Sequence, residues 1–158
     1  MALPLYEIVL IDGLKQSTRR GIVFLRQKGN EELNASDVFA DLSVKLFRTV
    51  RSRFDYWIDG GICDDYFHGF PNNQKYKLCL VFKWKVARQC QRMYGFLRHP
   101  LAHSNAAFQL CVLCSHATKN QWETDPDELG VALRLSSEPD ALVAIKTAFP
   151  DAKPKAKQ

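Results

Sequence analysis

The stretch Tyr76-Lys-Leu-Cys-Leu-Val-Phe-Lys-Trp-Lys-Val86 decides the fold, because its apolar residues recur at every second position. One side carries five apolar residues: Leu78, Leu80, Phe82, Trp84 and Val86. The other side carries Lys77, Cys79, Val81, Lys83 and Lys85. A period of two is that of a β-strand, whose successive side chains point to opposite faces of a sheet. The stretch therefore predicts a strand with one apolar face and one face rich in lysine.

Two more strands are predicted after this one. Residues 92–98 alternate in the same way, with Arg92, Tyr94, Phe96 and Arg98 on one side. Residues 108–116 form a third apolar run. Strands joined by short connections are usually neighbours in the sheet, so we expect three antiparallel strands.

The period changes to about four residues before this sheet. Apolar side chains recur at six positions: Val38, Leu42, Leu46, Val50, Phe54 and Ile58. This spacing predicts one amphipathic helix of about five turns, with Asn34 or Ser36 as N-cap and an end at Gly60-Gly61. The runs 5–11 and 22–25 predict two short strands before the helix.

Two helices are predicted after the sheet. The sequence Asp125-Pro-Asp-Glu128 is typical of a helix start, and the helix is expected to end near Leu135. A second helix is expected to begin after Ser137. The predicted fold class is therefore α+β, in which an amphipathic helix precedes an antiparallel sheet and C-terminal helices, all within one domain.

Charge is unevenly distributed along the 158 residues, whose net charge is +5. Residues 61–122 contain eight basic and two acidic side chains, and residues 66–122 contain no carboxylate. Such a segment is expected either to form a surface that binds a polyanion or to form the solvent-exposed face of a sheet. No apolar run approaches the ~20 residues of a membrane span. With no signal peptide pattern either, we expect a cytoplasmic protein with no membrane partner.

Several kinds of chemistry are disfavoured by the sequence. The spacing Cys111-x-x-Cys114-x-His116 resembles a zinc site, but on a strand Cys111 and Cys114 would point to opposite faces. Cys114 and His116 would share a face, either as a reactive pair or as a buried thiol beside a polar strand end. The carboxylates needed for a two-metal nuclease are missing from the basic segment, and no glycine-rich phosphate loop is present. No metal and no cofactor are therefore expected.

A metal-free cationic site remains. Its candidate residues lie on the three predicted strands: Lys83, Lys85, Arg92, Tyr94, Arg98, His116 and Lys119. If their faces coincide, the cations could hold RNA phosphates and the aromatic ring could stack on an unpaired base. Such a surface also suits cleavage of RNA by its own 2′-hydroxyl, which needs a base, an acid and charge stabilisation. The alternative is a solvated sheet face with Tyr94 and Phe96 in the core.

The order of these segments resembles a known family. The strand Tyr76–Lys85 is followed by Arg92-Met-Tyr-Gly-Phe-Leu97, then by Phe108-Gln-Leu-Cys-Val-Leu-Cys-Ser-His-Ala-Thr-Lys119, and then by Trp122-Glu-Thr-Asp-Pro-Asp-Glu-Leu-Gly-Val-Ala132. Over residues 70–135 this resembles the RelE/ParE toxin superfamily, particularly its HigB-like, phage-derived branch. Members of that branch run from a "yRvlyff" strand to a "vlLhgF.KK" strand and then a "tP..ei..A" helix.

The resemblance implies a curved antiparallel sheet and the toxin of a type II toxin–antitoxin system. Such a toxin cleaves mRNA at the ribosome without metal, and a cognate antitoxin covers its basic face. By position, Arg92 resembles the arginine that contacts the scissile phosphate, Lys119 resembles the lysine that ends the next strand, and His116 lies beside it. These three are the predicted catalytic residues. Lys83, Lys85, Tyr94 and Arg98 are the predicted RNA-binding residues.

The chain departs from the family pattern at several points. The family's Lys-Lys doublet is Lys119-Asn120 here. We expect one RelE-like domain over residues 1–149, with residues 1–35 as an N-terminal extension that extends or covers a sheet edge. Residues 150–158 are expected to be a disordered basic tail. Some relatives, of the ParE type, inhibit gyrase and cut no RNA, so a binding protein of this fold without nuclease activity is the alternative function.

Overall fold

The computed structural model describes residues 5–119 and 126–152. Its strands are β1 (Tyr6–Leu10), β2 (Arg20–Gln27), β3 (Phe67–Gly69), β4 (Cys79–Val86), β5 (Gln89–Arg98) and β6 (Gln109–Lys119). Its helices are α1 (Ala35–Ala40), α2 (Val44–Ile58), α3 (Pro126–Leu135) and α4 (Pro139–Ala148). The predicted α+β class is confirmed.

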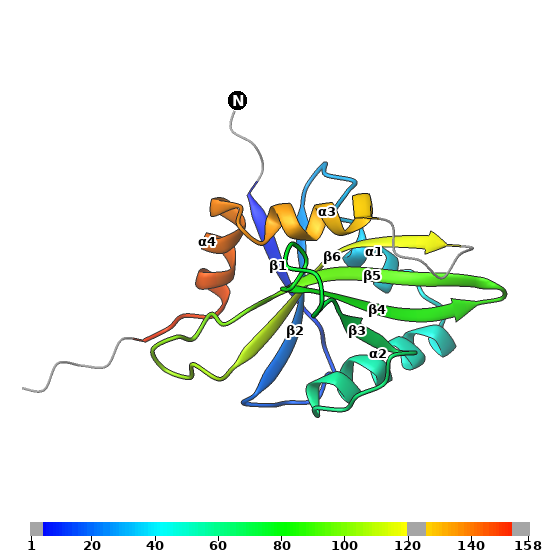
Figure 1. Ribbon diagram of the computed structural model, residues 1–158, viewed down its shortest axis with the longest axis horizontal. Coiled ribbons are helices and arrows are strands. Elements are labelled where there is room, and N and C mark those ends of the chain that lie inside the picture. The colour runs from blue at the N-terminus through cyan, green and yellow to red at the C-terminus, as the bar shows by residue number, and fades with distance from the viewer. Residues whose placement is uncertain (1–4, 120–125, 153–158) are drawn as a thin grey trace, which may run out of the picture.

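The six strands form one open sheet in the order β1-β2-β6-β5-β4-β3 (Figure 1). The antiparallel pairing predicted for β4, β5 and β6 is confirmed. β2 pairs in parallel with β6, and β1 pairs antiparallel with β2 at the sheet edge. The N-terminal strands therefore extend the sheet, as expected, and β2 supplies part of its core.

Helices cover both faces of the sheet. α1 and α2 pack on the face that carries Phe24, Phe82 and Trp84. α3 and α4 pack on the opposite face, against residues such as Val81 and Phe96. Because both faces are covered, side chains in the centre of the strands are buried whichever face they point to. The alternation in β4 therefore separates residues that pack under α2 from residues that pack under α3, and not buried residues from solvent-exposed ones.

The prediction of one helix between Val38 and Ile58 is wrong, because the chain breaks into α1 and α2 at residues 41–43. Ser43 caps α2, and its Oγ accepts a hydrogen bond of 3.3 Å from the Leu46 amide. The break lets Phe39 of α1 stack on Phe54 of α2, with ring centroids 5.7 Å apart. The predicted stop is confirmed, since Gly60 takes the left-handed φ of +86° after α2.

A β-bulge shifts the register between β5 and β6. Tyr94 pairs with Ser115 and Gly95 pairs with Leu113, so Cys114 is the extra residue. Gly95 is required here, because a Cβ on it would clash with the carbonyl oxygen of Val112. The bulge reverses the inward and outward parity of β6 after Leu113.

The C-terminal helices agree with their predicted bounds, with one change. α3 ends at Leu135 as expected, but α4 is capped by Glu138, whose carboxylate accepts a 2.9 Å hydrogen bond from the Ala141 amide. Asp151 accepts hydrogen bonds from the amides of His103 and Ser104. The rest of the expected tail, residues 153–158, lies outside the described residues. Within residues 5–119 and 126–152, no helix has the length and apolar character that crossing a bilayer requires.

Replacing Gly95 by alanine is expected to lower the free energy of unfolding by about 3 kcal/mol, because backbone atoms of β6 would have to move. Gly130→Ala in α3 is the matched control. A Cβ there meets nothing within 4 Å, and alanine favours a helix over glycine by up to about 1 kcal/mol. Urea unfolding of both variants checks this. Equal midpoints would contradict the close approach of β5 and β6 at the bulge.

Candidate cationic site on the β4–β5 hairpin

The structure brings three predicted site residues together on one sheet face. Lys83 of β4 pairs directly with Arg92 of β5, and Lys85 pairs with Cys90. Residues two apart on a strand share a face, so Lys83, Lys85 and Arg92 are close neighbours near the hairpin turn. Lys119 of β6 pairs with Cys90 in the sheet register, and its side chain lies outside the described part of the chain.

Lys83 and Arg92 form a cross-strand pair of like charges. Arg92 is buried, with 1% of its surface exposed, and Lys83 is half-buried. Burial and the positive charge of Arg92 lower the pKa of Lys83, and Cys90, Asp65 and Asp64 oppose this shift only in part. Like charges directly opposite each other destabilise a sheet. A bound anion would relieve this repulsion.

Arg92 is held by its strand neighbours. Burial disfavours its charge, but side-chain hydrogen bonds with Cys90 and Tyr94 outweigh this effect and raise the Arg92 pKa. The guanidinium therefore remains a fixed positive charge beneath the surface. It can act on a ligand through its electric field while Lys83 and Lys85 make the outer contacts.

A groove of about 680 Å³ adjoins the two lysines, between α2 and the hairpin. Its charged lining consists of four basic side chains and one acid: Lys45, Arg53, Lys83, Lys85 and Asp65. Arg53 donates to the Lys83 carbonyl and stacks 4.3 Å above the ring of Tyr66. The Lys83 amide in turn donates to the Tyr66 carbonyl over 2.8 Å. The groove therefore combines four basic residues, of which Arg53 is held in place, with an aromatic ring.

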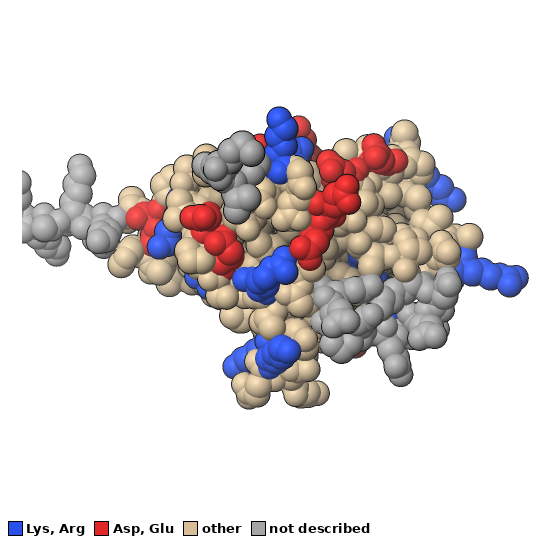
Figure 2. All heavy atoms as spheres, turned by 90° about the horizontal axis from the view of Figure 1, so that it is seen from above, with Lys and Arg blue, Asp and Glu red and all other residues tan. Residues whose placement is uncertain are grey.

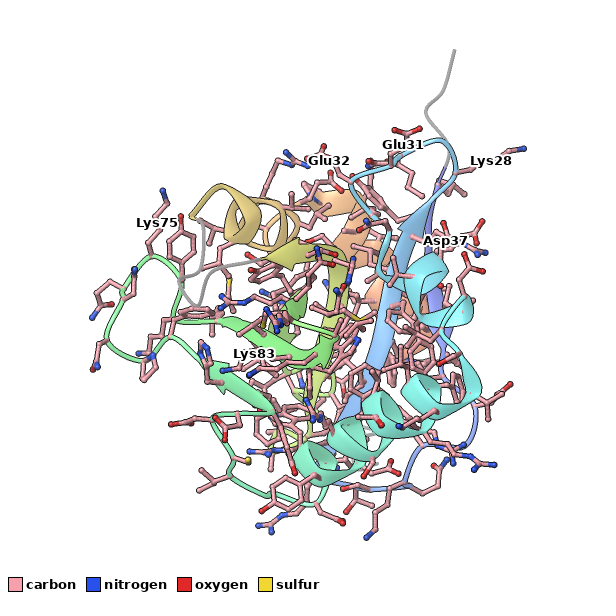
Figure 3. All side chains as sticks on the ribbon, turned by 90° about the vertical axis from the view of Figure 1, so that its right-hand side faces the viewer. Lys28, Glu31, Glu32, Asp37, Lys75 and Lys83 are labelled. Carbon is pink, nitrogen blue, oxygen red and sulfur yellow. The ribbon has the colours of Figure 1, made fainter. Side chains whose placement is uncertain are left out.

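Charged side chains of both signs lie on the surface around the site. In Figure 2, acidic and basic side chains both lie over the middle of the face in view, and basic side chains lie at the end where the hairpin tip lies. In Figure 3, Lys83 lies over the strands, well apart from the labelled acidic side chains. Lys83 and Lys85 would attract a polyanion that approaches the hairpin.

His116 lies on the opposite face of the sheet from Arg92. It pairs with Met93, and its ring packs on Trp84 with centroids 5.7 Å apart. Its Nε2 lies 2.7 Å from Oε1 of Gln91, and its backbone amide donates to the Asn34 side chain over 2.8 Å. The predicted site residues of the three strands therefore do not share one face. The alternation of β6 after its bulge points the His116 side chain to the face that α1 covers.

Two of the predicted RNA-binding residues, Tyr94 and Arg98, make contacts within the protein. Tyr94 is fully buried in the cluster under α3, with Val81 and Leu129, so its ring offers no face to a base. Phe96 is also fully buried, and the alternative that placed these two aromatics in the core is confirmed. Arg98 lies at the far end of β5, where its Nη1 donates to the Ser136 carbonyl over 3.5 Å.

The cysteines belong to the core. Cys111 and Cys114 lie in clusters on opposite faces, as predicted. The prediction that Cys114 and His116 share a face is wrong, because the bulge at Cys114 reverses the parity. Burial raises the pKa of the Cys79 thiol to about 11 and also raises those of Cys111 and Cys114. Among the described residues, no group of three or more His, Cys, Asp or Glu side chains could hold a metal ion.

His68 belongs to this site and was not expected there. Residues 63–73 look like a loop in sequence, but Phe67–Gly69 form β3, and His68 pairs with Val81 of β4. This places His68 on the same face as Lys83 and Arg92, whose charges both act on it. A three-residue edge strand next to glycine and proline has no periodicity from which it could be recognised.

Comparisons with known proteins add no relative. No protein-family model matches the chain, and no significant similarity to a curated protein or to a solved structure was found. The class that the structure itself defines is an α+β protein with a cationic site on a β-hairpin.

Thiol labelling is expected to distinguish buried from accessible cysteines. Cys63 and Cys90 are partly exposed, whereas the other three thiols are buried. Iodoacetamide at pH 8 should therefore modify two thiols in the native protein and five after denaturation, because it reacts with thiolates that it can reach. Intact-mass measurement gives the count, and peptide mapping assigns it. Rapid native labelling of Cys111 or Cys114 would contradict the packing described here.

Proposed function

We propose that this protein binds single-stranded RNA at the β4–β5 hairpin and cleaves it without a metal ion. The observation that carries this proposal is the cross-strand pair of Lys83 and Arg92 in a segment without carboxylates from residue 66 to 122. A phosphate of RNA bound at this face would interact favourably with both positive charges.

Each cation has a distinct part in this proposal. Lys83 and Lys85 bind backbone phosphates, and the groove with Arg53 and Tyr66 accepts the neighbouring nucleotide. Attack by the 2′-hydroxyl adds negative charge to the phosphate in the transition state. The fixed charge of Arg92 stabilises that state more than the ground state, which is the requirement for catalysis.

The order of elements supports a RelE/ParE-like toxin as the finer form of the proposal. An amphipathic helix precedes the β4–β5–β6 meander, and two helices follow it, as the resemblance implies. In this form the protein is a cytoplasmic toxin that cleaves mRNA at the ribosome. A cognate antitoxin would then neutralise it by covering the basic hairpin.

A binding protein of this fold without nuclease activity is the second candidate. The observation that favours it is the separation of Arg92 and His116 by the sheet, since these were two of the three predicted catalytic residues. Under this alternative the hairpin cations bind a polyanion or a protein such as gyrase, and no phosphodiester bond breaks.

Charge removal at the hairpin is expected to weaken RNA binding. The double variant Lys83→Gln/Lys85→Gln should bind a single-stranded uridine 12-mer more weakly. The slope of log K against log salt should become shallower by about 1.4, because each lost phosphate contact removes about 0.7. Fluorescence anisotropy at several salt concentrations measures both quantities.

The matched control for this experiment is Lys75→Gln/Lys77→Gln, which removes the same charge from exposed positions just before β4. It should leave the affinity and the salt slope close to those of the wild type. If both double variants lose affinity equally, binding follows net charge and the hairpin is not the RNA site.

Expression of the wild type is expected to arrest bacterial growth, and primer extension should show new 5′ ends in translated mRNA. Lys83→Gln/Lys85→Gln should relieve the arrest, whereas the Lys75/Lys77 control should not. Arrest without new 5′ ends would favour the second candidate, and harmless expression would count against a toxin.

A further inference from the structure

His68 lies at the edge of the cationic face, where it is reachable from solvent. It pairs with Val81, so Lys83 is its diagonal cross-strand neighbour, at a spacing of about 7–8 Å. It is half-buried, so part of its ring remains open to solvent. A phosphodiester held by Lys83 would therefore lie beside the imidazole.

One hydrogen bond sets the tautomer of His68. Its Nδ1 lies 2.9 Å from the Gly69 carbonyl oxygen, which can only accept a hydrogen bond. Nδ1 therefore carries the proton, and in the neutral ring Nε2 keeps its lone pair. The backbone thus orients the ring and leaves Nε2 as the proton acceptor.

The surroundings of His68 keep it neutral. Burial lowers its pKa, and the positive charges of Lys83 and Arg92 lower it further. The hydrogen bond to Gly69 and the charge of Asp64 act in the opposite direction without reversing the shift. The ring of Phe70 packs edge-on against the imidazole, with centroids 5.1 Å apart. At neutral pH the imidazole is therefore unprotonated, the state that a general base requires.

We propose that His68 is the general base of the RNA cleavage proposed above, on which this inference rests. Nε2 removes the proton of a 2′-hydroxyl, and the 2′-oxygen forms a bond to phosphorus. The bond from phosphorus to the 5′-oxygen breaks, and that oxygen takes a proton from water. The products are a 2′,3′-cyclic phosphate and a 5′-hydroxyl, and His68 returns its proton to solvent.

Lys83 and Arg92 complement this role in two ways. They stabilise the charge that builds on the phosphoryl oxygens, and they keep the neighbouring imidazole unprotonated until it accepts the 2′ proton. His68 thus supplies the base on the same face as the phosphate-binding cations, a position that His116 does not occupy.

The test uses His68→Asn, because the asparagine amide can still donate to the Gly69 carbonyl while the Nε2 base is lost. His99→Asn is the matched control. The Nδ1 of His99 makes the same kind of hydrogen bond, 3.0 Å to the Phe108 carbonyl, at the other end of the sheet. Cleavage is measured with ribosome-bound mRNA from pH 4.5 to 8, and binding of the uridine 12-mer is measured in parallel.

For the wild type, kcat/KM is expected to fall with unit slope as pH drops through a pKa below 6.5, because protonated His68 cannot accept a proton. His68→Asn should lose at least about 100-fold in kcat and keep its RNA affinity. Its kcat/KM should no longer fall as the pH drops, which removes the acidic limb of the pH–rate profile. Free imidazole should restore part of the activity. His99→Asn should behave as the wild type does.

Three outcomes would overturn the proposal, and they are distinct. If the wild type cleaves and His68→Asn keeps both its rate and its acidic limb, another group is the base, although the proposed function stands. If the wild type binds RNA and leaves no cyclic phosphate end, the proposed cleavage fails and the role of His68 fails with it. Loss of RNA binding by His68→Asn would assign His68 to binding instead.

Discussion

The structure depends on the burial of the β4–β5–β6 meander on both faces. Helices from before and after the meander pack on opposite sides of it, so every position in its centre faces one core or the other. Under that constraint, register decides the surroundings of each side chain. The bulge at Gly95 and Cys114 is therefore as important as any single contact, because it changes the parity of β6.

The same constraint creates the cationic site. In the middle of the meander, α3 covers Val81 and Tyr94, and the face there is apolar. Two positions toward the hairpin turn, the same face carries Lys83 and Arg92 as a direct cross-strand pair. Like charges directly opposite each other in a sheet repel, and local conflicts of this kind are typical of functional sites. This pair is the feature from which we propose that the site binds an anion.

Much of the fold could be predicted, because a long segment with a regular spacing of apolar residues can be recognised as a helix or a strand from the sequence alone. The strands of the meander, the stop at Gly60 and the helix that ends at Leu135 all follow from local patterns. The break between α1 and α2 was missed because the apolar residues keep the same spacing on both sides of it. Only the cap at Ser43 marks the start of a new helix. Of the site, Lys83, Lys85 and Arg92 were found through alternation. His68 was not, because its edge strand has three residues and exists only through pairing with β4.

The sequence by itself determined where the charge lies, which segments form strands, and that carboxylate chemistry is missing between residues 66 and 122. These properties follow from composition and from the spacing of apolar residues, and they do not depend on contacts between distant segments. Only the tertiary structure decided that Arg92 joins Lys83 and His68 on one face while His116 joins Trp84 on the other. The physical reason is that alternation divides a strand into two sets of side chains. Which set is covered depends on register and on helices that are distant in sequence.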